Sequence, residues 1–474
     1  MPFPRVAIAF GSLSLVLAFA TPSFANGRFP AANQLVVHPG DPNTLIVRAT
    51  FGLLVSHEQG KSPRLVCDVI IGAAAVVDPG VALFGDGTFL VAAPEGLAVS
   101  RDNACSFPFI GGELANQRFI DVSVDHTNPL RALALSATRR DDGTENVRVF
   151  ETTNAGATWA AISSGLDPNV LVTTLDVAPS NGQRVYLSGN RVVSGKLEGF
   201  VGRSDDGGKT FVYATANYAK ATQIYIAGVD PLDADLLYLR TYFTDAGPSS
   251  LVVSRDGGKT FEIALTIQSN MSGFALSPDG SRVAIAGLQT GVTVAARPLG
   301  PDAGPLSMTF EEHSPLPMRC LGWTGNKLFG CGSGVPLGCG NGDGQFLLGS
   351  SEDEGRTWNT VIPLMADIGA PNPDCADDTP SKKVCGPIYP TLQKLLTCPY
   401  VKLDAGTKDA APEAGDAGTT KPPPDNCDCG VVGSPAPITP VGMFGLGVAG
   451  LGATGLGVRR IVRRKRARAA RRSR

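Results

Sequence analysis

The chain has 474 residues, among them 57 glycines and 36 prolines, and only 18% of its residues are charged. Its apolar residues form short runs of Val, Leu, Ile and Ala between turn-forming clusters of Pro, Gly and Asp, a pattern that predicts an all-β fold. The last sixteen residues contain nine Arg and one Lys; without them the chain has 31 basic and 43 acidic residues and a net charge of −12. This balance excludes a global basic surface for nucleic acid.

The N-terminus has the three-part layout of a secretory signal peptide. Residues 1–25 contain Arg5, an apolar stretch over 6–20 and a small-residue exit that ends at Ala25, so we expect cleavage before Asn26 and export. A buried apolar helix is the structural alternative. Export places the cysteines in an oxidising compartment. The candidates for disulfides are Cys67, Cys105, Cys320, Cys331, Cys339, Cys375, Cys385 and Cys398.

Six of these cysteines lie between residues 320 and 398, which predicts a loop-rich, disulfide-stapled closing region whose pairing stays open. A zinc site is the alternative, but it requires closely spaced Cys pairs or His partners. The chain has only four histidines, and only His313 lies near one of these cysteines. We therefore expect no metal and no cofactor. The histidines, which we expect at surface or turn positions, are His38, His57, His126 and His313.

An eight-residue motif recurs along the chain. It starts with a hydroxyl residue, has Asp at the third position and Gly at the fifth, and ends with a hydroxyl residue and an aromatic residue. Clear copies start at Ser204, Ser254 and Ser351, a copy with Asn starts at Thr152, and worn copies start at Ser100 and Ser56. The motif residues that we expect to hold turns are Ser100, Asp102, Thr152, Asn154, Gly156, Trp159, Ser204, Asp206, Gly208, Thr210, Phe211, Ser254, Asp256, Gly258, Thr260, Phe261, Ser351, Asp353, Gly355, Thr357 and Trp358.

The spacing of the motif predicts the architecture. Successive copies are 44, 52, 52, 50 and 97 residues apart, so the last gap is two periods and one copy has decayed, with a remnant before Thr309 and Phe310. Seven units of about fifty residues correspond to the four-stranded blades of a single seven-bladed β-propeller. The motif itself suits a turn, because Asp or Asn accepts backbone hydrogen bonds and Gly supplies a positive φ. A structural role therefore explains it better than a catalytic one.

These octapeptides resemble the Asp-box, or bacterial neuraminidase, repeat of seven-bladed propellers, a family that includes sialidases, sortilin-type receptors and photosystem assembly-factor-like proteins. The resemblance covers residues 34–363 and implies the fold, but the family mixes enzymes with binding scaffolds. A sialidase needs an Arg cluster, a Tyr nucleophile with a Glu and an acidic proton donor. Arg28, Phe29 and Pro30 match the family's Arg-x-Pro signature, yet no phrase sets a Tyr and a Glu in a late blade. We expect no catalytic residue.

The C-terminal part differs in composition. Residues 401–436 have almost no bulky apolar side chains, which predicts a disordered linker that includes Cys427 and Cys429. Residues 437–474 contain a Gly-rich apolar segment over 441–458, near the lower length limit for a membrane helix, followed by the Arg cluster, which we expect on the cytoplasmic side. This order resembles the C-terminal sorting signals of myxobacterial surface proteins, in which a Cys-containing site is processed. Whether the tail is retained or cleaved stays open.

We thus predict a signal peptide over 1–25 and a propeller with a Cys-rich closing region over 26–400, before the linker and tail. The predicted function is a non-enzymatic, monomeric scaffold at the cell surface that binds a protein or a glycan, and a sialidase-like glycan hydrolase is the alternative. Two long segments are the expected contact regions: residues 232–249, with Tyr238, Tyr242 and Phe243, and the Cys-rich region 331–398.

Overall fold

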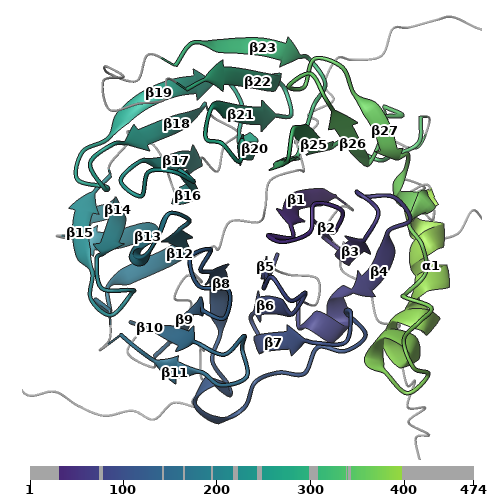
Figure 1. The fold of residues 1–474 in the computed structure, drawn as a ribbon, viewed down its shortest axis with the longest axis horizontal. Helices are drawn as coiled ribbons and strands as arrows, with labels where there is room; N and C mark the ends of the chain where they lie inside the picture. The colour runs from purple at the N-terminus through teal and green to yellow at the C-terminus, as the bar shows by residue number, and fades with distance from the viewer. Residues whose placement is uncertain are drawn as a thin grey trace, which may run out of the picture. The chain divides into compact units, whose positions relative to one another are not determined.

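The computed structural model describes residues 31–397, except 74–77, 141–143, 164–165, 194–195, 217–222, 243–247, 298–307, 338 and 340–342. In this part of the chain, 27 strands form six four-stranded sheets and one three-stranded sheet. Each sheet consists of consecutive antiparallel strands, and the sheets stand as blades around a central axis (Figure 1). The predicted seven-bladed propeller is confirmed. The predicted signal peptide, linker and tail, together with Arg28, Cys398, Cys427 and Cys429, lie outside the described residues.

Every blade begins at the axis and runs outward. The inner strands are β1 (Ala32–Val37), β5 (Gly80–Leu83), β8 (Phe119–Val124), β12 (Val170–Ala178), β16 (Gln223–Val229), β20 (Met271–Leu276) and β24 (Cys320–Thr324). The second strands are β2 (Leu45–Ala49), β6 (Phe89–Ala93), β9 (Ala132–Arg139), β13 (Asn181–Val193), β17 (Leu237–Tyr242), β21 (Arg282–Gly287) and β25 (Lys327–Cys331).

The third strands are β3 (Gly52–Ser56), β7 (Gly96–Ser100), β10 (Glu145–Thr152), β14 (Lys196–Ser204), β18 (Ser249–Ser254), β22 (Gly291–Ala296) and β26 (Leu348–Ser351). The outer strands are β4 (Arg64–Cys67), β11 (Ala160–Ala161), β15 (Val212–Thr215), β19 (Glu262–Ile267), β23 (Phe310–Ser314) and β27 (Asn359–Ile362). Blade 2 has no fourth strand of this kind. Its β7 edge instead bonds to a short segment, through Val99 N–H to Pro108 O at 3.1 Å and Ile110 N–H to Leu97 O at 2.9 Å.

The hydrophobic core is divided into seven clusters among the described residues, one at each seam between neighbouring blades. Because each blade packs against a neighbour on both faces, its middle strands are buried on both faces. Strands β3, β7 and β18 are buried at every position, which explains why they are apolar runs without alternation. The cluster that joins blade 7 to blade 1 includes Leu45 and Phe329, so the ring is closed by side-chain packing.

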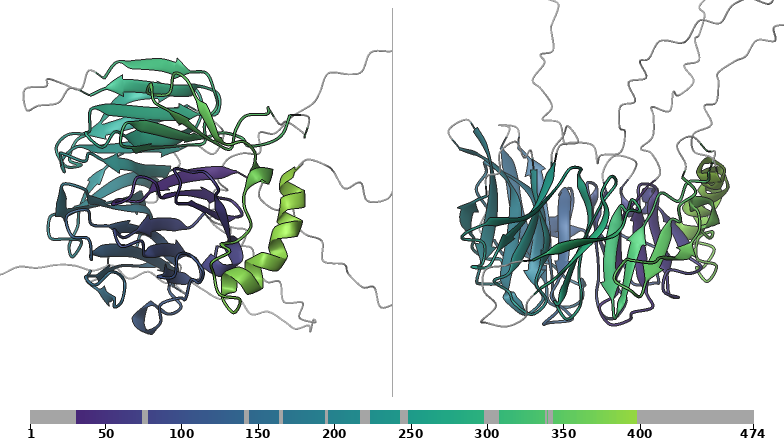
Figure 2. Two further views of the ribbon diagram at one scale, coloured as in Figure 1. Left: turned by 45° about the vertical axis from the view of Figure 1, so that its right-hand side comes forward. Right: turned by 90° about the horizontal axis from the view of Figure 1, so that it is seen from above.

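The closing region differs from the expectation. After β27, residues 363–397 run back over blades 1 and 2 as a strap, which contains η3 (Met365–Asp367), the π-helical η4 (Ser381–Cys385) and α1 (Gly386–Thr397). Figure 2 shows α1 beside the strands of blade 1. This helix was not predicted from the sequence. No helix within the described residues is long and apolar enough to cross a membrane.

Two disulfides attach the strap to the start of the ring. Cys67 of β4 bonds to Cys385, and Cys105 of blade 2 bonds to Cys375, across sequence separations of 318 and 270 residues. A third disulfide joins Cys320 to Cys331 within blade 7, and Cys339 is also disulfide-bonded. The cysteines of the closing region therefore do not staple it only to itself. They join it to blades 1 and 2, which chain spacing alone does not indicate.

Two short 3-10 helices complete the described elements: η1 (Asp68–Ile71) follows β4, and η2 (Gly112–Leu114) precedes β8. Both lie in connections between blades. They add no layer to the propeller.

Candidate functional site

The six octapeptides occupy equivalent corners of the ring. Each starts at the last residue of a third strand, which is Ser56, Ser100, Thr152, Ser204, Ser254 or Ser351. Each spans the turn toward the outer edge of its blade. The predicted decayed copy lies in the corresponding connection between β22 and β23. We call these connections the octapeptide turns.

The turn of blade 4 shows what the motif does. The Ser204 hydroxyl donates to Asp206 Oδ1 at 2.7 Å and accepts from Gly208 N–H at 2.8 Å. Asp206 also accepts from Thr210 N–H at 2.9 Å and from the Thr210 hydroxyl at 2.6 Å. Matching bonds occur in the turns that start at Ser254 and Ser351. The carboxylate is thus occupied by its own turn.

The turns that start at Thr152 and Ser100 use the same bonds with different residues. Asn154 replaces the Asp, accepting from Thr158 N–H at 2.9 Å and donating through Nδ2 to the Thr158 hydroxyl at 2.8 Å. Asp102 accepts from Ser106 N–H at 3.0 Å. The two central residues of each turn have positive φ, which suits the Gly207–Gly208 pair and puts Asn103 and Ala104 in a conformation that favours glycine.

Hydrogen bonding also fixes the charge of these aspartates. Donation by the Thr210 hydroxyl, then by the Thr210 amide and the Ser204 hydroxyl, lowers the pKa of Asp206 to about 2. The equivalent bonds from Thr357 and Ser351 lower the pKa of Asp353 to about 2. A carboxylate that is ionised at neutral pH and fully hydrogen-bonded does not exchange protons there. The octapeptide turns therefore stabilise the fold and are poor candidates for catalysis.

Side chains from the preceding blade hold several turns from outside. Arg101 donates to Ala155 O at 2.8 Å, and Arg131 donates to Gly207 O at 2.7 Å. His313 lies 2.7 Å from Glu354 O and donates through Nδ1, because a carbonyl only accepts. In each case the acceptor is the fourth residue of the next turn. Sequence analysis missed these contacts, since a backbone carbonyl acceptor leaves no pattern in the sequence.

Two neighbouring carboxylates lie on the inner strands of blades 3 and 4. Asp121 of β8 accepts from Val122 N–H at 2.9 Å and from Leu175 N–H of blade 4 at 3.0 Å. Burial raises the pKa of Asp121 to about 6. Burial, and then repulsion by Asp121, raises the pKa of Asp176 of β12 well above its usual range. Because both oxygens of Asp121 bind backbone amides, this residue links two blades, and Asp176 is the acid of the pair that is left for a ligand.

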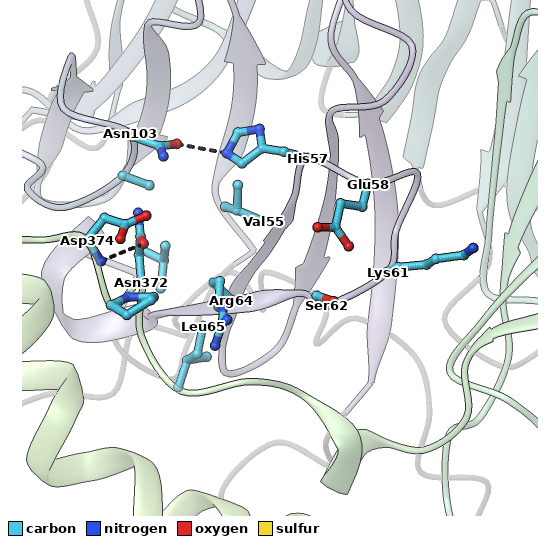
Figure 3. Close-up of a pocket in the computed structure, with 13 residues that line it drawn as sticks. Val55, His57, Glu58, Lys61, Ser62, Arg64, Leu65, Asn103, Asn372 and Asp374 are labelled. Atoms are coloured by element: carbon cyan, nitrogen blue, oxygen red, sulfur yellow. Dashed lines mark hydrogen bonds between the residues drawn. The ribbon is translucent and has the colours of Figure 1, made fainter.

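A cleft lies at the outer seam of blades 1 and 2, and we call it the seam cleft (Figure 3). Its volume is about 210 Å³. One wall is the turn of blade 1, another is the turn of blade 2, and the third is the strap. Its lining residues are Val55, His57, Glu58, Lys61, Ser62, Arg64, Leu65, Val66, Asn103, Ala104, Asn372, Pro373 and Asp374.

The worn turn of blade 1 supplies the cleft with a free acid. Glu58 takes the third position, where the intact turns have Asp, and its carboxylate makes no hydrogen bond within the described part of the chain. In Figure 3 Glu58 and Asp374 lie on opposite sides of the cleft, whereas Lys61 extends away. Sequence analysis noted the worn turn but not the cleft. The Glu at an Asp position was the available signal.

A histidine and a disulfide hold the walls of the seam cleft in place. His57 Nε2 donates to Asn103 Oδ1 at 2.9 Å, which joins the turns of blades 1 and 2. On its other side, Nδ1 of His57 lies 2.9 Å from the hydroxyl of Thr44. The Cys105–Cys375 disulfide follows Ala104 in one wall and Asp374 in another. The cleft is therefore preorganised.

Other predicted residues are dispersed. Among the predicted contact residues, Tyr238 lies on β17 and is fully buried in the cluster between blades 5 and 6, so the prediction of a contact loop there is wrong for this residue. Phe243 lies outside the described residues. The four histidines fall on separate blades or turns, and no group of three or more His, Cys, Asp or Glu suited to a metal occurs in the described ranges.

Comparisons with known proteins return structures but no sequence relatives. No protein-family model matches the chain, and no curated protein matches it. An ancestral GH74 enzyme is 16% identical over 64% of this chain and 44% of its own, with a TM-score of 0.49. The GH74 xyloglucanase from Xanthomonas campestris is 15% identical over 69% and 63%, with a TM-score of 0.33. The WD40 repeats of RRP9 are 14% identical over 65% and 89%, with a TM-score of 0.45.

The chain thus spans less than two thirds of the length of both GH74 structures. All three likenesses are far below the identity at which an activity is shared. They include GH74 enzymes and a set of WD40 repeats. The function must therefore be argued from the residues of this chain.

Proposed function

We propose that this protein is an exported, non-enzymatic binding scaffold of the cell surface, and that the seam cleft is its recognition site. The observation that carries this proposal is the Glu58 carboxylate, which is released from the structural role of its position and faces the cleft. Glu58 is free and exposed, and it lies opposite a second acid, Asp374. A disulfide fixes the walls that hold these acids, and such a preorganised cleft is suited to binding.

Surface localisation is part of the proposal. The three disulfides are compatible with an extracellular protein. The N-terminal signal sequence and the Arg-rich tail, which we expect to direct export and sorting, support the same location. The geometry of the octapeptide turns supports a relation to the Asp-box propellers.

A glycan hydrolase is the second candidate, and the carboxyl pair on the inner strands favours it. A carboxyl group with a raised pKa, such as that of Asp176, is a feature of general acids in glycosidases. Such enzymes need a second carboxylate for the nucleophile or base, and Asp121 is occupied by the Leu175 and Val122 amides. This pair therefore offers one acid where the chemistry needs two.

Two assays on the exported chain separate the candidates. In the first, the protein is incubated with a panel of fluorogenic glycosides, and we expect no turnover above buffer. Turnover that Asp176→Asn abolishes would overturn the non-enzymatic assignment. In the second, the labelled protein is applied to glycan and peptide arrays. We expect binding that Glu58→Gln weakens and that Glu262→Gln, an exposed acid on blade 5, leaves unchanged.

A further inference from the structure

We infer that the seam cleft binds one ring of an uncharged sugar. This inference rests on the proposed function and adds the class of ligand. The volume of the seam cleft, about 210 Å³, is below the range of about 300–1,000 Å³ typical of pockets for drug-sized molecules. The cleft therefore has room for a single ring or side chain, and the chemistry of its lining decides between ligands.

The polar groups of the lining include both hydrogen-bond acceptors and donors. Glu58 and Asp374 are acceptors, and Arg64 is a donor. His57 uses both ring nitrogens for Thr44 and Asn103, which leaves the Asn103 Nδ2 group as a further donor. A cation needs only acceptors and an anion only donors. A hydroxyl group donates and accepts at once, so a ring with neighbouring hydroxyls matches a mixed set.

The lining also includes aliphatic residues, beside the polar Lys61, Ser62 and Asn372. Val55, Leu65, Val66, Ala104 and Pro373 border the same cleft. A sugar ring has C–H groups on its faces and hydroxyls at its rim, so it can pack on an aliphatic wall while its rim reaches the polar groups. An inorganic ion has no apolar part for such a wall. The composition of the walls thus agrees with the hydrogen-bonding groups.

A peptide that adds a strand is disfavoured at this position. Strand addition needs an open sheet edge, and the strap closes the edge of β4 here. Leu65 N–H donates to Gly369 O at 3.3 Å, and Gly369 N–H donates to Pro63 O at 2.8 Å. Cys67 N–H faces Cys385 Sγ at 3.2 Å. The backbone of the cleft wall is occupied, and recognition falls to side chains.

The test is saturation-transfer NMR and titration of the full chain with methyl glycosides of the common neutral hexoses, 6-deoxyhexoses and pentoses. n-Butylammonium and acetate serve as the cationic and anionic probes. We expect at least one glycoside to bind with a Kd on the order of millimolar, as befits a ligand of this size. Glu58→Gln and Asp374→Asn should each weaken it about tenfold, and Glu262→Gln should not.

Thermal melting checks that the variants fold, and we expect no shift because both acids are exposed and their carboxylates make no bond among the described residues. Preferential binding of butylammonium or acetate would overturn the sugar assignment. Failure of every glycoside, with array binding that still depends on Glu58, would also overturn it while the recognition site stands. Array and glycoside binding that ignore both substitutions would overturn the site itself.

Discussion

Replacing Asp206 tests the structural role of the octapeptide turns, and the chain contains its own control. Asp206→Ala removes a carboxylate that accepts from Ser204, Lys209 and Thr210. A net hydrogen bond is worth about 1 kcal/mol, and water replaces part of the loss at this exposed turn, so we expect a cost of about 1–2 kcal/mol. In a propeller of this length the expected drop in Tm is about 2 °C.

Asp206→Asn should cost less, because Asn154 already holds the equivalent turn in blade 3. The two variants also differ from the wild type in pH dependence. Hydrogen bonding lowers the folded pKa of Asp206 from its ordinary 3.8 to about 2, so its contribution to stability is complete above about pH 5 and is lost as pH falls toward 2. Both variants should lack this component. Melting curves at pH 2.5–7 test it, and an Asp206→Ala protein that melts like the wild type would refute the assigned role.

Three further predictions concern Asp176, the strap and the backbone of the octapeptide turns. Burial raises the pKa of Asp176, so the folded protein favours the protonated side chain and becomes less stable as pH rises above 4. Asp176→Asn should therefore raise Tm at pH 7 but not near pH 3.5. An equal shift in Tm at both pH values would contradict this. Replacing the Cys105–Cys375 pair by Ser should cost about 2–5 kcal/mol in thermal unfolding, and no cost would show that the strap does not hold the ring. Gly208 has φ +97°, and a Cβ added there would lie 3.2 Å from Leu133, so Gly208→Ala should destabilise the protein by more than about 1 kcal/mol. Ala104 has φ +64°, so Ala104→Gly should stabilise it by about 0.5–1 kcal/mol in the same thermal unfolding assay.

The ring could be predicted because its signal is local and repeated. Ser204, Ser254 and Ser351 each end a third strand, as the apolar runs before them indicate. The positive φ values of the turns also follow from their glycines. The burial of Tyr238 was missed because the segment that holds it is rich in polar turn residues, although its apolar part forms β17.

The candidate site could not be predicted, because it joins residues far apart in the chain. Glu58 and Asp374 line one cleft only because the ring closes and the strap returns over blade 1. The pairing of Cys105 with Cys375 follows from the same long-range arrangement, and cysteine spacing leaves it undetermined. The raised pKa of Asp176 likewise depends on Asp121 of the neighbouring inner strand. Local sequence patterns contain none of these contacts.

The most direct measurement compares glycan-array binding by the wild-type chain with binding by Glu58→Gln, alongside a turnover assay on the same glycans. We predict that the wild type retains intact glycan, that the variant retains much less, and that no product forms with either. Equal retention by the two proteins, or release of cleaved sugar, would contradict it.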